Sequence, residues 1–459
     1  MNRIVPFFAV AATVAYAAVV PAQSRETPTE FVPVTDWLHA APQTPHVGAD
    51  DASTYVGFWI DAPPPAVRTV RPPLDVALVV DTSGSMGGAK IESARMAAAS
   101  FIDALSQGDI VSLYAFSDRA RELNAPTVVD DRSRAVLLER VRGLYANGGT
   151  NLWDGLTLAR RAVASAPPTH PVRRIVLISD GRANVGPASA AEFGTLAANT
   201  TEDGAQITAI GVGLDYDENT LGALAVHSAG RLYHLEQPEQ MASILQGELD
   251  LMARTVATNA VLEFEPAPGV GIEPTEELRV DRAPGRVRIP LGSLYGSQRR
   301  EILLRTHLSS GALGPRSIGR ARLVFEAPGQ PGRSVATREL PIAVDRVRAP
   351  TNAADGDEHV RVMVTRYEAA QAQMRASRLI DRGDYARADT ELRGAEERLR
   401  AAAAAPMHDA RLQGEVQRQA QGVAEGRAAT RRAVSAPSPA AVRGASLQNR
   451  SSAMDAYGY

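Results

Sequence analysis

Hydrophobic and polar positions change their period along the chain, and the first clear pattern covers residues 73–254. Short runs that are apolar throughout, such as 76–80 and 175–178, alternate there with longer segments in which apolar residues recur at helical spacing. Strands with no polar face are typical of a sheet that helices cover on both sides. The alternation therefore predicts an α/β domain with a doubly wound, parallel, Rossmann-like sheet.

The second pattern, over residues 255–348, has the two-residue period of strands with one buried face. Gly and Pro turns separate the expected strands, as is typical of an antiparallel β-sandwich. An isolated β-type run at 55–60 lies in an otherwise linker-like segment over 23–72, and we expect it to join this sandwich. The chain would then start in the sandwich, leave it to build the α/β domain, and return. The sandwich strands are expected at 260–265, 287–290, 301–308, 321–326 and 337–344.

The third pattern is helical and covers residues 357–433. Ala- and Arg-rich stretches at 358–380 and 385–404 predict a helical hairpin, and a third helix is expected over 410–432. From 434 to 459, Ser, Pro and Ala dominate, and we expect a disordered tail.

The first 22 residues differ from all of these regions. Arg3 precedes an apolar run over 4–19, and the small residues Val20-Pro21-Ala22 stand before Gln23. This arrangement predicts a signal peptide over 1–22; the alternative is an uncleaved membrane anchor, for which the run is short. No other segment is apolar enough to cross a membrane. We therefore expect no membrane span after cleavage and an extracytoplasmic protein that is periplasmic, held at the cell envelope, or secreted.

Composition narrows the range of partners and sites that the protein can have. The 459 residues have a net charge of −3 and scattered basic residues, which argues against nucleic acid as a partner. The chain has no cysteine, so disulfides, thiolate metal sites and a cysteine-linked lipid anchor are excluded. Stability must therefore come from packing alone.

Oxygen-bearing side chains follow the ends of the expected strands in three separate segments. Because the carboxyl ends of parallel strands meet at one edge of a sheet, we expect these side chains to converge there. Mg²⁺ prefers near-octahedral oxygen coordination. Neutral hydroxyls among its ligands would leave it electrophilic, with a position free for an Asp or Glu carboxylate of a partner protein. The site therefore predicts a binding protein with Mg²⁺ as cofactor, and Mn²⁺ or Ca²⁺ as alternatives. The five candidate metal ligands are Asp81, Ser83, Ser85, Thr150 and Asp180.

Parts of this site also have a purely structural interpretation. Asp81 followed by Ser could cap a helix, since Asp and Ser are both favoured there. Asp154 is better explained as a residue in the first turn of a helix than as a sixth metal ligand, because the helix dipole favours a carboxylate there. Asp118 follows another strand at the same edge, either at the rim of the site or in a solvated turn. The combination of Asp81 with Thr150 and Asp180 favours a metal site over simple capping.

The spacing Asp81-x-Ser83-x-Ser85, followed by Thr150 and Asp180, resembles the metal-ion-dependent adhesion site of von Willebrand factor type A domains. The neighbouring Gly-Gly-Thr-Asn and Ile-Ser-Asp-Gly sequences are also similar to that family, and the resemblance covers about 73–253. It implies a six-stranded, mostly parallel sheet with one short antiparallel edge strand. It also implies metal-dependent protein binding and no catalysis.

The order of regions is similar to that of bacterial extracytoplasmic proteins related to inter-alpha-trypsin inhibitor heavy chains or calcium-activated chloride channel regulators. Two alternatives to metal-dependent binding remain. One is a phosphohydrolase of the haloacid dehalogenase type with Asp81 as nucleophile. That chemistry needs a second Asp where Ser83 stands and a Lys in a late loop, whereas Lys90 opens the first expected helix. The other is a scaffold whose β-sandwich and helices carry the binding. We expect no enzyme activity and no catalytic residues, and these features do not determine the oligomeric state.

Overall fold

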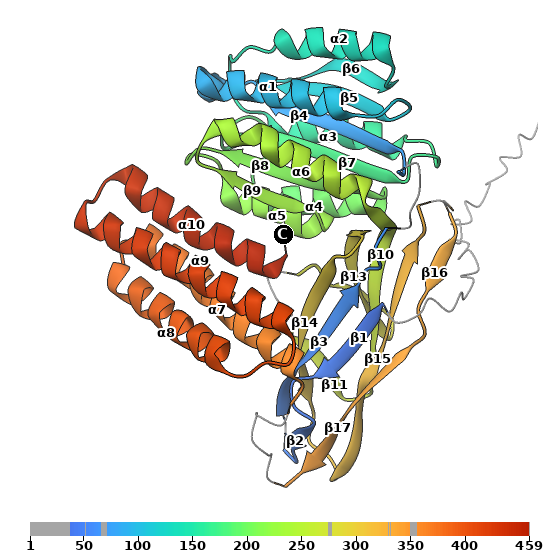
Figure 1. Ribbon diagram of the computed structural model, residues 1–459, viewed down its shortest axis with the longest axis vertical. Coiled ribbons are helices and arrows are strands. Elements are labelled where there is room, and N and C mark those ends of the chain that lie inside the picture. The colour runs from blue at the N-terminus through green and yellow to red at the C-terminus, as the bar shows by residue number, and fades with distance from the viewer. Residues whose placement is uncertain are drawn as a thin grey trace, which may run out of the picture.

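The computed structural model of the protein describes residues 37–50, 52–65, 71–273, 278–328, 330, 332–348 and 356–458. The expected signal peptide over 1–22 lies outside this part of the chain. Within it, no helix combines the length and apolar character that crossing a bilayer requires. An α/β unit stands above a β-sandwich in Figure 1, and a group of helices lies beside both.

One sheet organises the α/β unit. Strand β6 pairs antiparallel with β5, and the other neighbouring strands are parallel. The described residues thus form the six-stranded, doubly wound, mostly parallel sheet that the sequence predicts. In spatial order its strands are β6 (Ala120–Val128), β5 (Ile110–Phe116), β4 (Leu74–Asp81), β7 (Val172–Ser179), β8 (Ala205–Val212) and β9 (Arg231–Leu235).

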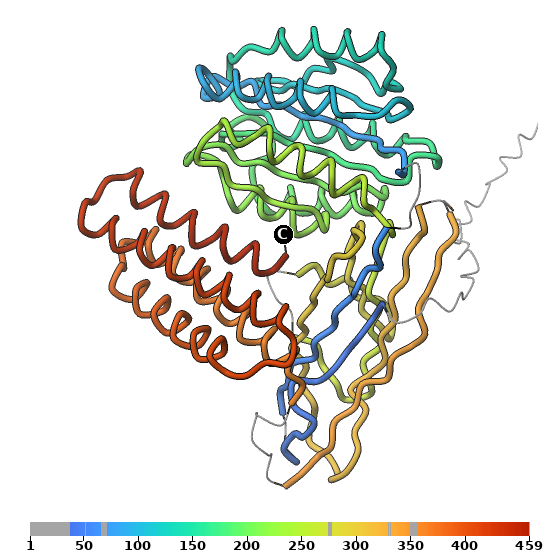
Figure 2. The backbone as a smooth tube through the Cα atoms, viewed as in Figure 1, coloured from blue at the N-terminus to red at the C-terminus, as the bar shows by residue number. Residues whose placement is uncertain are grey.

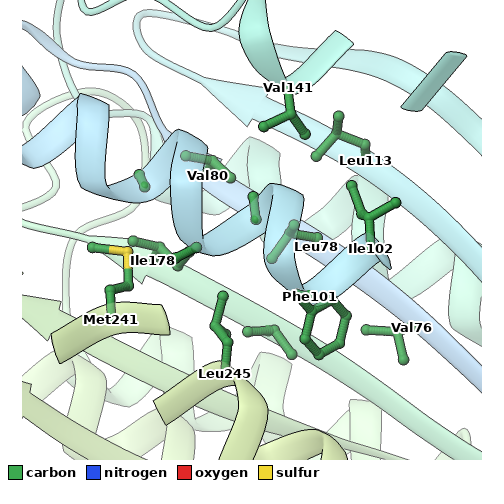
Figure 3. Close-up of a cluster of buried hydrophobic side chains, with 14 of the residues drawn as sticks. Val76, Leu78, Val80, Phe101, Ile102, Leu113, Val141, Ile178, Met241 and Leu245 are labelled. Atoms are coloured by element: carbon green, nitrogen blue, oxygen red, sulfur yellow. The ribbon is translucent and has the colours of Figure 1, made fainter. Parts of the chain in front are cut away.

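Helices cover both faces of this sheet, which explains why its central strands are apolar throughout. On one face, Phe101, Ile102 and Val141 pack with Met241 and Leu245 on the strand residues (Figure 3). Burying each large apolar side chain contributes about 1.5–3 kcal/mol. The first face carries α1 (Ala89–Ala104), α2 (Asp131–Arg142) and α6 (Met241–Ala253), with the short helix η2 (Pro238–Gln240) before α6. The other face carries α3 (Leu152–Ala164), α4 (Ala190–Glu202) and α5 (Glu218–Ser228).

The edge strand β6 has no clear signal of its own in the sequence. All of its residues are at least partly exposed, so no apolar run marks it. Pairing with β5 holds it in place, with Phe116 opposite Ala120 across the turn. The family resemblance predicted such an edge strand, whereas the hydrophobic pattern did not locate it.

The β-sandwich contains two sheets among the described residues. Strand β3 runs antiparallel to β14, from Asp61 opposite Arg299 to Ala52 opposite Leu308. Strands β1 and β2 lie in the segment expected to be a linker; that interpretation is wrong there, because β1 pairs with the nearby β3 and β2 pairs with β17, far along the chain. The first sheet has the order β1 (Leu38–Pro42), β3 (Ala52–Asp61), β14 (Arg299–Leu308) and β11 (Val270–Glu273). The second has the order β12 (Asp281–Ala283), β13 (Arg286–Tyr295), β10 (Thr255–Pro266), β15 (Gly314–Glu326), β17 (Leu340–Val347) and β2 (His46–Gly48), with β16 (Ser334–Ala336) on β15.

The helical unit ends with a helix where a disordered tail was expected. Ser438 caps this last helix by accepting from Ala441 N, and Pro439 occupies its first turn. Leu447 and Met454 of this helix belong to the apolar core of the α/β unit. The expectation of disorder is therefore wrong, because another unit of the protein supplies the apolar surface that the helix needs. The helices are α7 (Glu358–Asp381), α8 (Tyr385–Ala404), α9 (Ala410–Ser435) and α10 (Pro439–Tyr457), and Figure 2 shows the chain path through them.

Candidate functional site

Two strand ends bring the candidate carboxylates together. Asp81 ends β4 and Asp180 directly follows β7, and these two strands are parallel neighbours. Both residues are 0% exposed. Asp81 Oδ1 accepts a hydrogen bond from Ser83 N at 2.8 Å, and Asp81 Oδ2 accepts one from Ser179 Oγ at 2.6 Å. Asp81 is therefore held in one orientation at the carboxyl edge of the sheet.

Two candidate hydroxyls lie beside these carboxylates. Ser83 precedes the short helix η1 (Gly84–Met86), and Ser85 lies within it. Ser85 Oγ donates to Asp180 Oδ1 at 2.7 Å, and Ser83 Oγ lies 3.1 Å from Ser85 Oγ. The two serines are two residues apart in the sequence, and both hydroxyls lie on the same side of the loop.

The turn that carries Thr150 is attached to the loop after β4. Asn147 N donates to Thr82 O at 2.7 Å, and Gly84 N donates to Gly148 O at 3.0 Å. Thr150 is 4% exposed and stands just before α3. These backbone hydrogen bonds bring the Thr150 turn to the edge of the sheet where Asp81 lies.

A small space beside Gly181 is shared by hydroxyls from two loops. A Cβ atom at Gly181 would lie 3.3 Å from Thr150 Oγ1 and 3.6 Å from Ser85 Oγ, so both oxygens border the same space. Among the described residues, no three His, Cys, Asp or Glu side chains form a group suited to a metal. A cation here would therefore depend on hydroxyl oxygens as well as on Asp81 and Asp180, a donor set that suits a hard cation.

The electrostatics of the site are dominated by buried acids. Burial raises the pKa of Asp81 to about 6, hydrogen bonds from Ser179 and Ser83 oppose that rise, and the charge of Asp180 adds to it. Lys90 forms an ion pair with Asp180 Oδ2. A cation close to both acids favours their ionised forms. These acids and the neighbouring hydroxyls are therefore a donor set that is chemically suited to a divalent cation.

Several positioning residues were not recognised as such from the sequence. Asp118, for which both the rim of the site and a solvated turn were considered, is exposed but accepts from Gly149 N at 2.8 Å through Oδ1. Asn184 Oδ1 accepts from Thr150 N at 2.8 Å. Asp118 follows the end of β5, which is a usable signal in the sequence. Asn184 carries no such signal, because only the fold brings the loop after β7 to the Thr150 turn.

Comparison with known proteins agrees with the fold of the α/β unit. The sequence model of the von Willebrand factor type A domain matches residues 75–247. Uncharacterized protein sll0103 of Synechocystis sp. is 28% identical over 285 residues, which cover 60% of this chain and 66% of that protein. Inter-alpha-trypsin inhibitor heavy chain H4 of Homo sapiens is 28% identical over 199 residues, covering 42% of this chain and 21% of that protein. The chain thus spans less than two thirds of the length of each of these relatives.

A solved structure shares the fold over nearly the whole chain. The von Willebrand factor type A protein from Catenulispora acidiphila superposes with a TM-score of 0.68 at 18% identity, covering 94% of this chain and 98% of that one. At this identity the likeness concerns the fold alone. Together with the family match and the relatives, it shows that this chain contains a von Willebrand factor type A domain over residues 75–247.

Proposed function

We propose that this protein is an extracytoplasmic binding protein that captures an acidic side chain of a partner protein through a Mg²⁺-dependent adhesion site. It would be periplasmic, held at the cell envelope, or secreted. Domains of the von Willebrand factor type A family typically mediate protein–protein interactions. The observation that carries the proposal is the convergence of oxygen donors from three loops at one edge of the sheet.

We propose a role for each donor. Ser83, Ser85 and Thr150 would bind the cation through neutral hydroxyls, while Asp81 and Asp180 would bind it directly or through water. The bound cation would supply an electrophilic coordination position for the partner's carboxylate. Ser85 is exposed, so the site is open on the side from which a partner would approach.

Calorimetry tests the cation site separately from any partner. We expect the full chain to bind Mg²⁺ at one site and Asp81→Ala to lose that binding, because a buried anionic donor is removed. Asp103→Ala is the matched control, since Asp103 is an exposed acid on α1 away from the candidate donors. Absence of Mg²⁺ uptake by the wild-type chain would contradict the proposal. Competition with Mn²⁺ and Ca²⁺ then ranks the alternative cations.

Capture from an envelope extract tests the binding role. We expect partner capture by the wild-type chain to require Mg²⁺, to stop with chelator and to be absent with Asp81→Ala. Equal capture under all three conditions would instead support binding by the sandwich or the helices. A polar cleft of about 940 Å³ lies between the end of β9 and the helices, lined by residues such as Glu236, Arg418 and Asp455, and would then be the first place to examine.

The phosphohydrolase alternative has less support from the site. Its second acid would have to stand at position 83, where the Ser83 hydroxyl instead contacts Ser85. That chemistry would need a lysine in a late loop, whereas Lys90 lies in the first turn of α1 and pairs with Asp180. A phosphatase assay with a generic aryl phosphate and Mg²⁺ separates the two ideas, because the adhesion proposal expects no turnover dependent on Asp81.

A further inference from the structure

Lys90 places a positively charged group inside the candidate metal site. Its ammonium group forms an ion pair with Asp180 Oδ2; the Lys90 side chain is 25% exposed and the Asp180 side chain 0%. Lys90 lies in the first turn of α1, so its backbone is fixed beside the loop that carries Ser83 and Ser85. On the other side, a Cβ atom at Gly213 would lie 3.5 Å from Lys90 Cε, so the loop after β8 also confines this side chain.

The two oxygens of Asp180 serve different partners. Oδ1 accepts from Ser85 Oγ at 2.7 Å, and Ser85 is in contact with Ser83, whereas Oδ2 is taken by Lys90. A cation bound among the hydroxyls would thus share a single carboxylate with the ammonium group. Two like charges on opposite oxygens of one buried carboxylate repel each other, and the repulsion is screened less than between two exposed charges because the Asp180 side chain is 0% exposed.

We propose that Lys90 is a built-in competitor of the divalent cation at Asp180, which weakens cation binding so that the site fills only at high cation concentration. This inference rests on the proposed function, because it assumes that the donors bind a divalent cation. It assigns a role that a purely structural ion pair would not have: neutralising Lys90 should strengthen cation binding. A structural ion pair predicts the opposite, because its loss would loosen Asp180.

Calorimetric titration of Mg²⁺ into full-length variants tests the sign of this effect. We expect Lys90→Gln to bind Mg²⁺ at least about tenfold more tightly than the wild type, since one nearby positive charge is removed. Lys90→Arg keeps the charge and should stay close to the wild type. Arg182→Gln is the matched control, because it removes an exposed positive charge two residues after Asp180. Its effect should remain within about twofold, since exposed charges are screened by salt.

A second measurement follows Lys90 itself in the wild-type chain and uses a variant only to assign the signals. Lys90 is the only lysine of the sequence, so reductive methylation with a ¹³C label marks its ammonium together with the N-terminal amine while keeping the charge. A Lys90→Arg sample identifies the N-terminal signal. We expect the Lys90 methyl resonance to shift as Mg²⁺ is added, with the same midpoint as the calorimetric titration.

The outcomes separate this inference from the proposed function. If neither the wild type nor Lys90→Gln takes up Mg²⁺, both fail. If the wild type binds Mg²⁺ but Lys90→Gln binds it equally or more weakly, or if the Lys90 resonance does not move, only the competitor role of Lys90 is overturned. Tighter binding by Lys90→Gln together with a moving resonance would establish it.

Discussion

Replacement of Arg443 by Ala is expected to release the last helix from the α/β unit. Arg443 on α10 donates through Nε to Leu214 O at 2.9 Å and through Nη2 to Tyr216 O at 2.9 Å. It also pairs with both oxygens of Glu218, which is 6% exposed. Burial alone would raise the pKa of Glu218, but hydrogen bonds and charge from Arg443 outweigh burial and hold that pKa below its ordinary value.

The magnitude follows from the carboxylate that the substitution leaves behind. Removing one partner of a buried ion pair costs about 3–5 kcal/mol. Arg450 remains 3.4 Å from Glu218 Oε1, so we expect the lower end of that range. About 3 kcal/mol corresponds to a local opening that is roughly 100-fold more frequent.

Hydrogen exchange of the α10 amides measures this opening directly, which matters because a single unfolding free energy is poorly defined for a chain of several units. We expect α10 to exchange about 100-fold faster in Arg443→Ala. Arg431→Ala is the matched control, since Arg431 is 60% exposed in its ion pair with Asp389 and such pairs contribute about 0–1 kcal/mol. Adding Glu218→Gln should restore part of the protection, because no buried charge is then left unpaired. Less than a tenfold change in α10, or equal acceleration throughout α7–α9, would refute the reasoning.

Two further predictions concern the α/β unit. Gly211→Ala should destabilise this unit by about 1–3 kcal/mol, because the new Cβ would lie 2.7 Å from the Tyr216 ring. Gly222→Ala is the control and should be neutral or stabilising, since the space around Gly222 is open. Calorimetric melting compares the two variants, and equal melting temperatures would contradict the packing argument. Burial raises the pKa of Asp75 from 3.8 to about 7, and the charge of Arg173 opposes that rise. The folded state therefore binds the Asp75 proton more tightly than the unfolded state, so the free energy of unfolding should fall as pH rises from about 4 to 7. Asp75→Asn should make the free energy of unfolding less dependent on pH, and urea unfolding at neutral pH should show it raised by up to about 4 kcal/mol. If the wild type and Asp75→Asn lose stability with pH in parallel, Asp75 is not the cause.

Local patterns were sufficient to predict the α/β unit and the positions of its candidate donors. Strands such as β4 and β7 are apolar on both faces, and that requirement is visible in the sequence because it concerns consecutive residues. Asp81 and Asp180 were identified because polar residues immediately after such strands must lie at one edge of the sheet. The antiparallel edge strand β6 was expected only from the family resemblance, since its exposed residues follow no apolar pattern.

The tertiary structure alone decided which distant segments stabilise one another. Asn184 meets Thr150, and Lys90 meets Asp180, across separations in sequence that no local period encodes. The same reason explains why the prediction of a disordered tail over 434–459 was wrong. Its Ser-, Ala- and Pro-rich composition offers too little apolar surface to fold by itself, but Leu447 finds that surface on the α/β unit. A short pattern reveals whether a segment can bury one face, whereas only the folded chain supplies the surface against which that face is buried.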